Sequence, residues 1–139
     1  MVRAEMNEVG EFRSRSVLAV CCAGSDRSRY IAEELNNRGY FATGAEVMYG
    51  QNYVTPEDLQ NIGVIVFSSV HEKKIFDANS RLAAMVKRNG IEVRVLNITE
   101  SDKDLAHNCG KLTELKENIA RQLDCVGLTD LGSRGLRRK

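Results

Sequence analysis

The chain has no tryptophan, a single proline and no C-x-x-C cysteine pair among its 139 residues. No apolar run approaches the roughly 18 residues that a membrane-spanning helix needs. The polar start of the chain also lacks the apolar core of a signal peptide. A formal net charge of +1 at pH 7 gives no overall polyelectrolyte attraction to nucleic acid. These absences predict a cytoplasmic globular protein that binds neither membranes nor nucleic acid.

Cysteine is present, but not in a pattern that builds a disulfide scaffold. The four cysteines are Cys21, Cys22, Cys109 and Cys125. In a reducing compartment they are expected to be thiols, so their pattern indicates reactivity or packing. His107 and Cys109 lie close together, but two residues do not make a metal site. We therefore expect no metal and no cofactor.

Apolar runs alternate with helical patterns along the chain. Strands are predicted at 16–21, 40–48, 63–70 and 91–97, and helical segments at 28–38, 55–62, 71–88 and 111–123. Such alternation predicts an α/β domain in which a four-stranded parallel sheet carries helices on both faces. We place this single domain at 16–126, between a flexible extension at 1–15 and a flexible basic tail at 127–139.

The first strand runs into an unusual loop, which reads C-C-A-G-S-D-R-S over residues 21–28. Successive N–H groups in a strand-to-helix loop can form an anion cradle, and the positive end of the following helix faces the same space. Gly24 permits a left-handed turn within this loop. Arg27 can direct two N–H donors onto phosphate oxygens. In open parallel sheets, ligands bind beyond the carboxyl ends of the strands, where Cys21 is expected.

A thiol at such a loop lies in positive potential. We expect this potential to lower the pKa of the Cys21 thiol below the ordinary value of about 8.5, so that a thiolate nucleophile forms at neutral pH. Ser28 can donate a hydrogen bond to that thiolate. Of the four cysteines, only Cys21 has an arginine six residues later.

The segment from Cys21 to Ser28 resembles the signature loop of low-molecular-weight protein tyrosine phosphatases, in which Cys, five residues, Arg and Ser follow the first strand. The resemblance covers about residues 16–125. The stretches FATGAEV, TPEDLQNIGVIVFSSVHEKKI and VRVLNITESDKDL stand where that family has its second strand, its third-strand unit, and its fourth strand with the acid loop. A weaker likeness is to the phosphatases of the RNA polymerase II C-terminal domain, which share the fold.

The resemblance implies a flavodoxin-like fold and hydrolysis of phosphate monoesters, above all phosphotyrosine in proteins. Cys21 would form a phosphocysteine intermediate, Arg27 would bind phosphate and stabilise the transition state, and Ser28 would support the thiolate. The loop backbone would hold the phosphate oxygens through Cys22, Ala23, Gly24, Ser25 and Asp26. The partners implied are a phosphorylated protein substrate and phosphate-like oxyanions.

The departing oxygen needs a proton, which a carboxylic acid can supply. The candidates follow the fourth strand, namely Glu100, Asp102 and Asp104, and we favour Asp102. The family's general acid is usually an Asp followed by Pro, and this loop has no proline. Tyr49 and Tyr53 are candidates to flank a substrate ring by stacking.

Three other functions remain open at this stage. A phosphate-binding pseudoenzyme would recognise phosphorylated partners without turnover, and the missing Asp-Pro favours it. An arsenate reductase can share the loop but needs further cysteines, of which only Cys109 is suitably placed. A phosphotransfer subunit of a sugar-uptake system also carries phosphate on a cysteine, and Arg27 argues against it.

Overall fold

The computed structural model describes residues 15–21, 27–47, 54–98 and 109–131. Its strands are β1 (Ser16–Cys21), β2 (Phe41–Glu46), β3 (Val64–Phe67) and β4 (Glu92–Val95). Its helices are α2 (Arg27–Asn37), the 3-10 turn η1 (Glu57–Leu59), α3 (Val70–Asp77), α4 (Ser80–Arg88) and α6 (Cys109–Cys125). Within these ranges, no helix is both long and apolar enough to cross a membrane.

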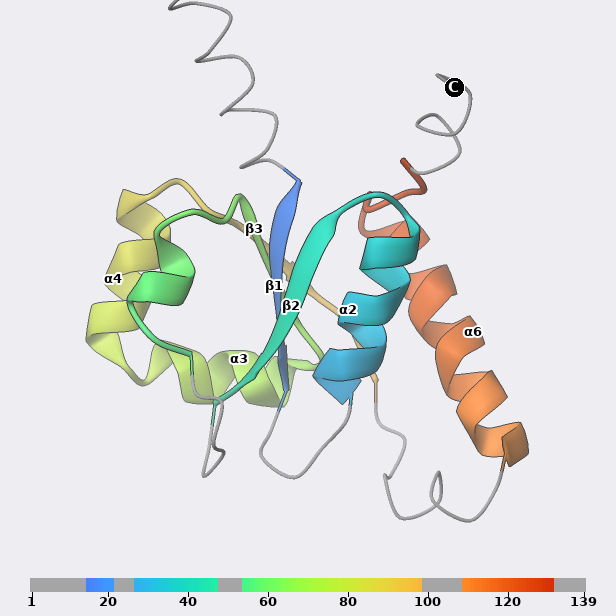
Figure 1. The fold of residues 1–139 in the computed structure, drawn as a ribbon. Helices are drawn as coiled ribbons and strands as arrows, with labels where there is room; N and C mark the ends of the chain where they lie inside the picture. The colour runs from blue at the N-terminus through green and yellow to red at the C-terminus, as the bar shows by residue number, and fades with distance from the viewer. Residues whose placement is uncertain (1–14, 22–26, 48–53, 99–108, 132–139) are drawn as a thin grey trace, which may run out of the picture.

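The four strands form one parallel sheet in the order β2-β1-β3-β4, which confirms the predicted α/β fold. Figure 1 shows three layers, with α2 and α6 on one face of the sheet and α3 and α4 on the other. β1 is central and fully buried along its length, as its continuous apolar run predicts for a strand covered on both faces. All strands end at the same edge of the sheet, which is the lower edge in Figure 1.

Side chains of β1 alternate between two hydrophobic clusters. Val17 and Ala19 pack under α2 and α6, whereas Leu18 and Val20 pack under α3 and α4. The first cluster takes its helical members from the stripes of α2 and α6: Ile31, Ala32, Leu35, Leu115, Ile119 and Leu123. The second takes its helical members from η1, α3 and α4: Leu59, Phe76, Leu82, Met85 and Val86. The core therefore holds both helical layers against the sheet.

The outer edge of β2 is covered by side-chain and loop contacts. The Asn36 amide donates to the Ala42 carbonyl at 3.0 Å and accepts from the Ala42 N–H at 2.9 Å, as a neighbouring strand would. Further along, the N–H of Val54 donates to the Glu46 carbonyl at 3.1 Å. These contacts satisfy backbone groups that an edge strand otherwise leaves open to another chain.

The single helix predicted at 71–88 is wrong, because the structure has two helices there. α3 ends at Asp77 and α4 starts at Ser80. Asn79 breaks the run: its backbone is extended, and its side chain accepts a hydrogen bond from the Leu82 N–H at 3.2 Å. An asparagine at this position is a favourable N-cap and starts a new helix at its own angle.

The predicted flexible tail is wrong for residues 127–131, which pack on the domain. Leu128 is buried in the cluster under α2 and α6, and Leu131 packs against that cluster. The Tyr40 hydroxyl donates to the Thr129 carbonyl at 3.0 Å. The ordered domain therefore continues past the expected boundary at 126, and residues 132–139 lie outside the described residues.

Candidate functional site

The two residues that carry the sequence hypothesis lie at the carboxyl edge of the sheet. Cys21 is the last residue of β1 and is buried, and Arg27 is the first residue of α2. Figure 1 shows that α2 starts at the edge where β1 ends, so the N-terminus of the helix is beside the end of the strand. The first turn of α2 contains no acidic residue to offset its positive end.

Ser28, the second residue of α2, packs against β2, the strand next to β1. Its side chain is buried, and a Cβ added to Gly44 of β2 would lie only 3.1 Å from the Ser28 Oγ. Glycine at 44 therefore lets α2 approach β2 closely enough to bury the Ser28 hydroxyl. Any larger residue at 44 would displace Ser28 or the start of α2.

A chain of hydrogen bonds connects Arg27 to the strand ends. The Arg27 Nη1 donates to the Ile98 carbonyl at 2.8 Å. The Ile98 N–H donates to the Ser68 carbonyl at 2.9 Å, and the Ser68 N–H donates to the Val20 carbonyl at 2.9 Å. The guanidinium is thus fixed beside the segment that follows β4, and that segment connects through Ser68 to Val20, the residue before the end of β1.

A buried serine–glutamate cluster closes the end of β3, and our sequence analysis missed it. The hydroxyls of Ser68 and Ser69 both donate to the Glu72 Oε1 at 2.6 Å. Ser68 and Glu72 are 0% and 1% exposed, so this is a fully internal polar contact. Ser69 is also the N-cap of α3, where its Oγ accepts from the His71 N–H at 3.2 Å. The spacing Ser-x-x-Glu is a capping-box pattern, and that signal could have found it.

Ser68 is the neighbour of Cys21 across the sheet. The register pairs Val20 with Phe67, so the next residues, Cys21 and Ser68, lie side by side at the strand ends. Ala19, which alternates in step with Cys21 along β1, faces α2 and α6, whereas the Ser68 hydroxyl contacts Glu72 of α3. The Ser68 hydroxyl donates its hydrogen to Glu72, and this bond holds the Ser68 side chain in one orientation.

Several predicted site residues lie outside the described residues. They are the loop residues Cys22, Ala23, Gly24, Ser25 and Asp26, the acid candidates Glu100, Asp102 and Asp104, and the loop tyrosines Tyr49 and Tyr53. Cys109 opens α6, and its side chain also falls outside the described part. The structure therefore places Cys21, Arg27 and Ser28 together at one edge and leaves the remaining assignments as predictions.

A cleft of about 270 Å³ lies between the end of β2 and the two helices α3 and α4. Its lining combines apolar side chains with Asn79 and with Glu46, the residue paired with Cys21 in the sheet register. The Glu46 Oε2 is buried and has no hydrogen-bond partner within the described ranges of the chain. This cleft adjoins the strand end but lies on the α3/α4 side.

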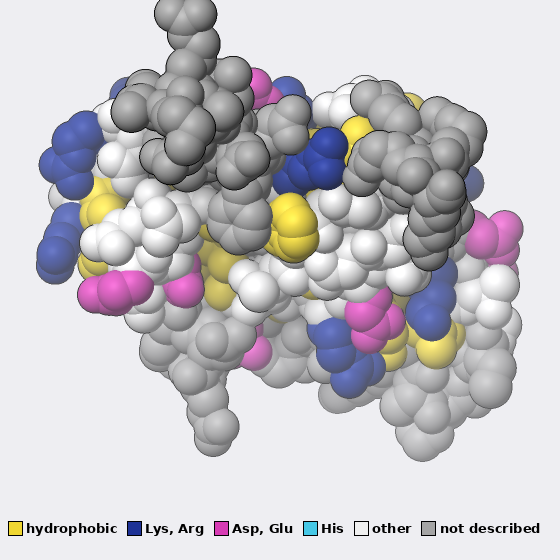
Figure 2. Space-filling view, turned by 45° about the horizontal axis from the view of Figure 1, so that its top comes forward, with side chains coloured by type: hydrophobic (Ala, Val, Ile, Leu, Met, Phe, Trp, Pro, Cys, Tyr) yellow, Lys and Arg dark blue, Asp and Glu magenta, His cyan; other side chains and the backbone are white. Residues whose placement is uncertain are grey.

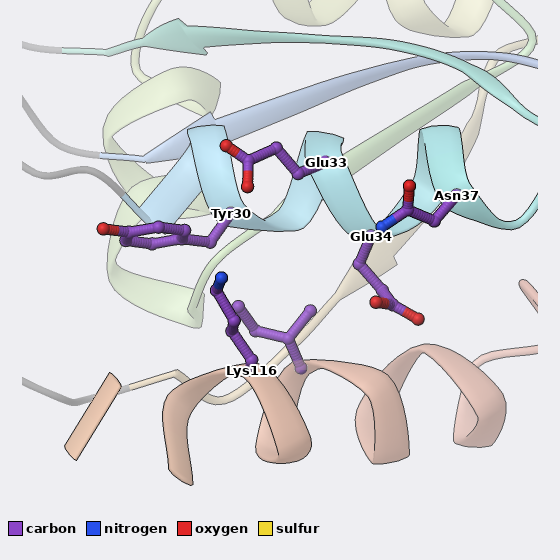
Figure 3. A pocket seen from close by; sticks show the side chains of 6 residues that line it. Tyr30, Glu33, Glu34, Asn37 and Lys116 are labelled. Atoms are coloured by element: carbon purple, nitrogen blue, oxygen red, sulfur yellow. The ribbon is translucent and has the colours of Figure 1, made fainter. Parts of the chain in front are cut away.

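A smaller pocket of about 50 Å³ lies between α2 and α6. Figure 3 shows Tyr30, Glu33, Glu34 and Asn37 on α2, with the Lys116 ammonium directed toward the Tyr30 ring. The Lys116 Nζ lies 5.7 Å from the ring centroid, and the Arg29 guanidinium lies 4.8 Å from it. The Lys116 contact joins α6 to α2, whereas the Arg29 contact lies within α2.

Positive and negative side chains are interspersed on the face drawn in Figure 2, and a basic group lies over α4 at its left. In the described ranges, no group of three or more His, Cys, Asp or Glu side chains is arranged to hold a metal ion.

No protein-family model matches the chain, and no curated protein matches it. Among solved structures, the rubredoxin oxygen:oxidoreductase from the anaerobe Desulfovibrio gigas is similar over 85% of this chain and 38% of that chain. The sequence identity is 11% and the TM-score is 0.41. This chain spans well under half the length of that structure, and so weak a likeness carries no argument about function.

Proposed function

We propose that this protein is a cysteine-dependent phosphatase that hydrolyses phosphate monoesters, with phosphotyrosine in proteins as the substrate class. One observation carries the proposal: Cys21 ends the central strand at the edge where Arg27 opens the next helix. Five residues lie between Cys21, a residue that can act as a nucleophile, and Arg27, a residue that can bind an anion. The resemblance of the Cys21–Ser28 segment to the low-molecular-weight phosphatase loop supports the same activity.

The local electrostatics favour an anion at this edge. The amino end of α2 supplies a partial positive charge, and the Arg27 guanidinium supplies a full one. Because Cys21 is buried in the sheet at this end, its thiolate would feel both with little screening by water. The same potential that binds a phosphate dianion therefore also favours the thiolate.

The reaction would proceed in two balanced steps. The Cys21 thiolate attacks phosphorus, so an S–P bond forms while the bond from phosphorus to the departing oxygen breaks, and an acid protonates that oxygen. Water then attacks the phosphocysteine, the S–P bond breaks, and the carboxylate formed in the first step takes the proton from water. Inorganic phosphate leaves, and the thiolate and the acid are restored.

Each residue has a distinct role in this scheme. Arg27 would fork two donors onto the equatorial phosphoryl oxygens, where negative charge spreads in the transition state. To do so, its guanidinium would exchange or share the bond it makes to the Ile98 carbonyl. Ser28, buried against Gly44, would direct its hydroxyl hydrogen to the sulfur and stabilise the thiolate when it returns as a leaving group.

The experiment is hydrolysis of p-nitrophenyl phosphate from about pH 5 to 8 under reducing conditions, a range chosen to bracket a lowered thiol pKa. The parent should turn over this substrate, and Cys21→Ser should not. Cys125→Ser is the matched control, since Cys125 is an exposed cysteine at the far end of α6. It should keep the parent rate.

The outcomes separate the alternatives. Equal rates for the parent and Cys21→Ser would contradict the proposal. A parent that binds phosphate or vanadate without any turnover would favour a phosphate-binding pseudoenzyme. Arsenate-dependent consumption of a thiol reductant, lost in Cys109→Ser, would favour an arsenate reductase. The leaving group of p-nitrophenyl phosphate is good, so the test does not depend on which residue is the general acid.

A further inference from the structure

The two edge strands of the sheet, β2 and β4, differ in how their outward backbone groups are hydrogen-bonded. On β2, Asn36 and Val54 cover the outward backbone groups of Ala42 and Glu46. Along β4, the Glu92 N–H donates to the Gly63 carbonyl and the Leu96 N–H donates to the Phe67 carbonyl, both at 2.9 Å, so the intervening odd-numbered residues direct their backbone groups outward. Backbone groups of β4 therefore point away from the sheet, where another strand could pair with them.

The outward groups of β4 are covered at its two ends and, in the middle, at the Val93 carbonyl, which accepts from Arg94 Nη1 at 3.1 Å. The Gln122 amide of α6 pairs with both the N–H and the carbonyl of Asn97, and the Ile91 N–H donates to the Val86 carbonyl at 3.0 Å. Between them, the N–H groups of Val93 and Val95 and the carbonyls of Ile91 and Val95 have no hydrogen-bond partner among the residues that the structure describes. An open run of this kind is a template for another strand.

We propose that this edge binds a second copy of the same chain, by antiparallel pairing of β4 with its counterpart about a two-fold axis at Val93. The sequence at the edge is self-complementary. With Val93 opposite Val93 of the other copy, Glu92 of each copy faces Arg94 of the other on the same face of the sheet. Opposite charges at directly opposed positions stabilise a strand pair, whereas like charges destabilise it.

This register uses the open groups. Each Val93 N–H donates to the Val93 carbonyl of the other copy, and each Val95 N–H donates to the Ile91 carbonyl of the other copy. The Val93 carbonyl already accepts from Arg94 Nη1 at 3.1 Å, and its second lone pair remains for the new bond. A shift of the axis by one residue would place Arg94 opposite Arg94, so the charges select the register.

Glu92 is accessible, whereas Arg94 is partly accessible and its Nε also donates to the Val126 carbonyl at 3.0 Å. Glu92 is 60% exposed and Arg94 is 33% exposed, and they pair within one copy at 2.8 Å. Val93 and Val95 are half-buried against the α3/α4 cluster, so pairing would bury more of their apolar surface. The dimer would be isologous, because each copy contributes the same patch.

Pairing at β4 leaves the candidate phosphatase site open. The two copies would form one continuous sheet with their strands running in opposite directions, so the two Cys21 edges would face opposite ends of the dimer. Activity per chain should therefore be the same in monomer and dimer. This proposal stands independently of the phosphatase proposal.

Sedimentation equilibrium tests the pairing, from about 10 µM to about 1 mM chain and at low ionic strength, because salt screens exposed ion pairs. The mass of the parent should rise with concentration from 15.5 kDa toward twice that value. Glu92→Arg and Arg94→Glu should each stay at the monomer mass, because like charges then oppose each other. An equimolar mixture of the two variants should associate again, because their charges are complementary.

Glu33→Arg, a charge reversal of the same size on an exposed face of α2, is the control and should associate like the parent. Far-UV circular dichroism checks that each variant is folded. A parent that stays at 15.5 kDa throughout, a single variant that associates like the parent, or a mixture that stays monomeric would each overturn the proposal.

Discussion

The Arg27 guanidinium donates a 2.8 Å hydrogen bond to the carbonyl of Ile98. Ile98 is the last described residue before the segment that carries the acid candidates. Asp102 is four residues further along the chain. A fully extended chain spans at most about 14 Å over four residues, so Asp102 lies within that distance of Ile98, the residue that the guanidinium contacts. The contact therefore ties the predicted phosphate-binding residue to the segment that would supply the proton.

Replacing Arg27 should remove both oxyanion binding and turnover. Arg27→Ala should lower kcat/KM for p-nitrophenyl phosphate by about 10²–10³-fold or more, the usual cost of losing a donor to transition-state charge. Arg27→Lys keeps the charge but loses the fork, so it should recover only part of the affinity. Isothermal titration with vanadate measures the binding. Arg29→Ala, on an exposed neighbour in α2, should bind and turn over like the parent; equal losses in both variants would rule out a specific role for Arg27.

One of the acids after β4 should matter only when the leaving group is poor. Asp102→Asn should slow hydrolysis of an alkyl phosphate by about 10²–10⁴-fold and affect p-nitrophenyl phosphate far less, because general acid catalysis helps most where the departing oxygen is basic. Glu100→Gln and Asp104→Asn, assayed in parallel, show whether the role belongs to a neighbour. If all three variants turn over the alkyl phosphate at the parent rate, the acid is not in this loop.

The serine–glutamate cluster should contribute to stability. Glu72→Ala leaves two buried hydroxyls without their acceptor and should lower the free energy of unfolding by about 2–3 kcal/mol. Glu72→Gln retains an acceptor oxygen and should lie between this variant and the parent. Urea unfolding midpoints at constant m-value measure the difference. Glu117→Ala, on an exposed face of α6, is the control and should have the same urea unfolding midpoint as the parent. A Glu72→Ala midpoint equal to that of the parent would contradict a stabilising role for the cluster.

Arg38 should hold the last described segment to the domain. Its side chain, 8% exposed, donates to Glu34 at 2.8 Å, to Asp124 at 2.7 Å and to the carbonyls of Leu128 and Ala120 at 2.9 Å. Arg38→Met should lower the free energy of unfolding by about 2–3 kcal/mol, or the Tm by roughly 10 °C. Arg29→Met removes contacts of an exposed side chain, among them those with Glu33 and Tyr30, and should change the Tm little. Equal Tm values for both variants would contradict this account.

The contribution of Arg38 should not depend on pH near neutrality. Burial lowers the pKa of Arg38, but its hydrogen bonds and ion pairs to Glu34 and Asp124 outweigh burial and leave the pKa raised above its ordinary value. A cation with a raised folded pKa contributes stability below its unfolded pKa and loses it only as the pH rises through the folded value. Both values lie above the neutral range. The Tm difference between the parent and Arg38→Met should therefore be constant from about pH 6 to 9 as far as Arg38 titration is concerned.

The strands and their parallel arrangement could be predicted from the sequence, because each central strand is a short apolar run between helical patterns. The run that holds Val64–Phe67 is the clearest case. The break between α3 and α4 could not be seen in apolar spacing, since Phe76, Leu82 and Val86 all face the same cluster. Asn79 held the signal for that break as an N-cap.

Polar contacts between residues far apart in the sequence could not be predicted from local sequence patterns. Arg38 stands in a polar stretch at the end of α2, and its partners Ala120, Asp124 and Leu128 lie more than 80 residues away. Only the tertiary fold brings them together. The same holds for Gln122, whose pairing with Asn97 leaves the middle of β4 as the open part of that edge.

The most direct test of the central claim is to trap the covalent intermediate. The protein is mixed with an excess of p-nitrophenyl phosphate, quenched within one turnover, digested and examined by mass spectrometry. We predict one phosphoryl group on Cys21 and none on the adjacent Cys22, and loss of the adduct in Cys21→Ser. Steady turnover with no adduct, or an adduct on a different residue, would contradict catalysis through a Cys21 phosphocysteine.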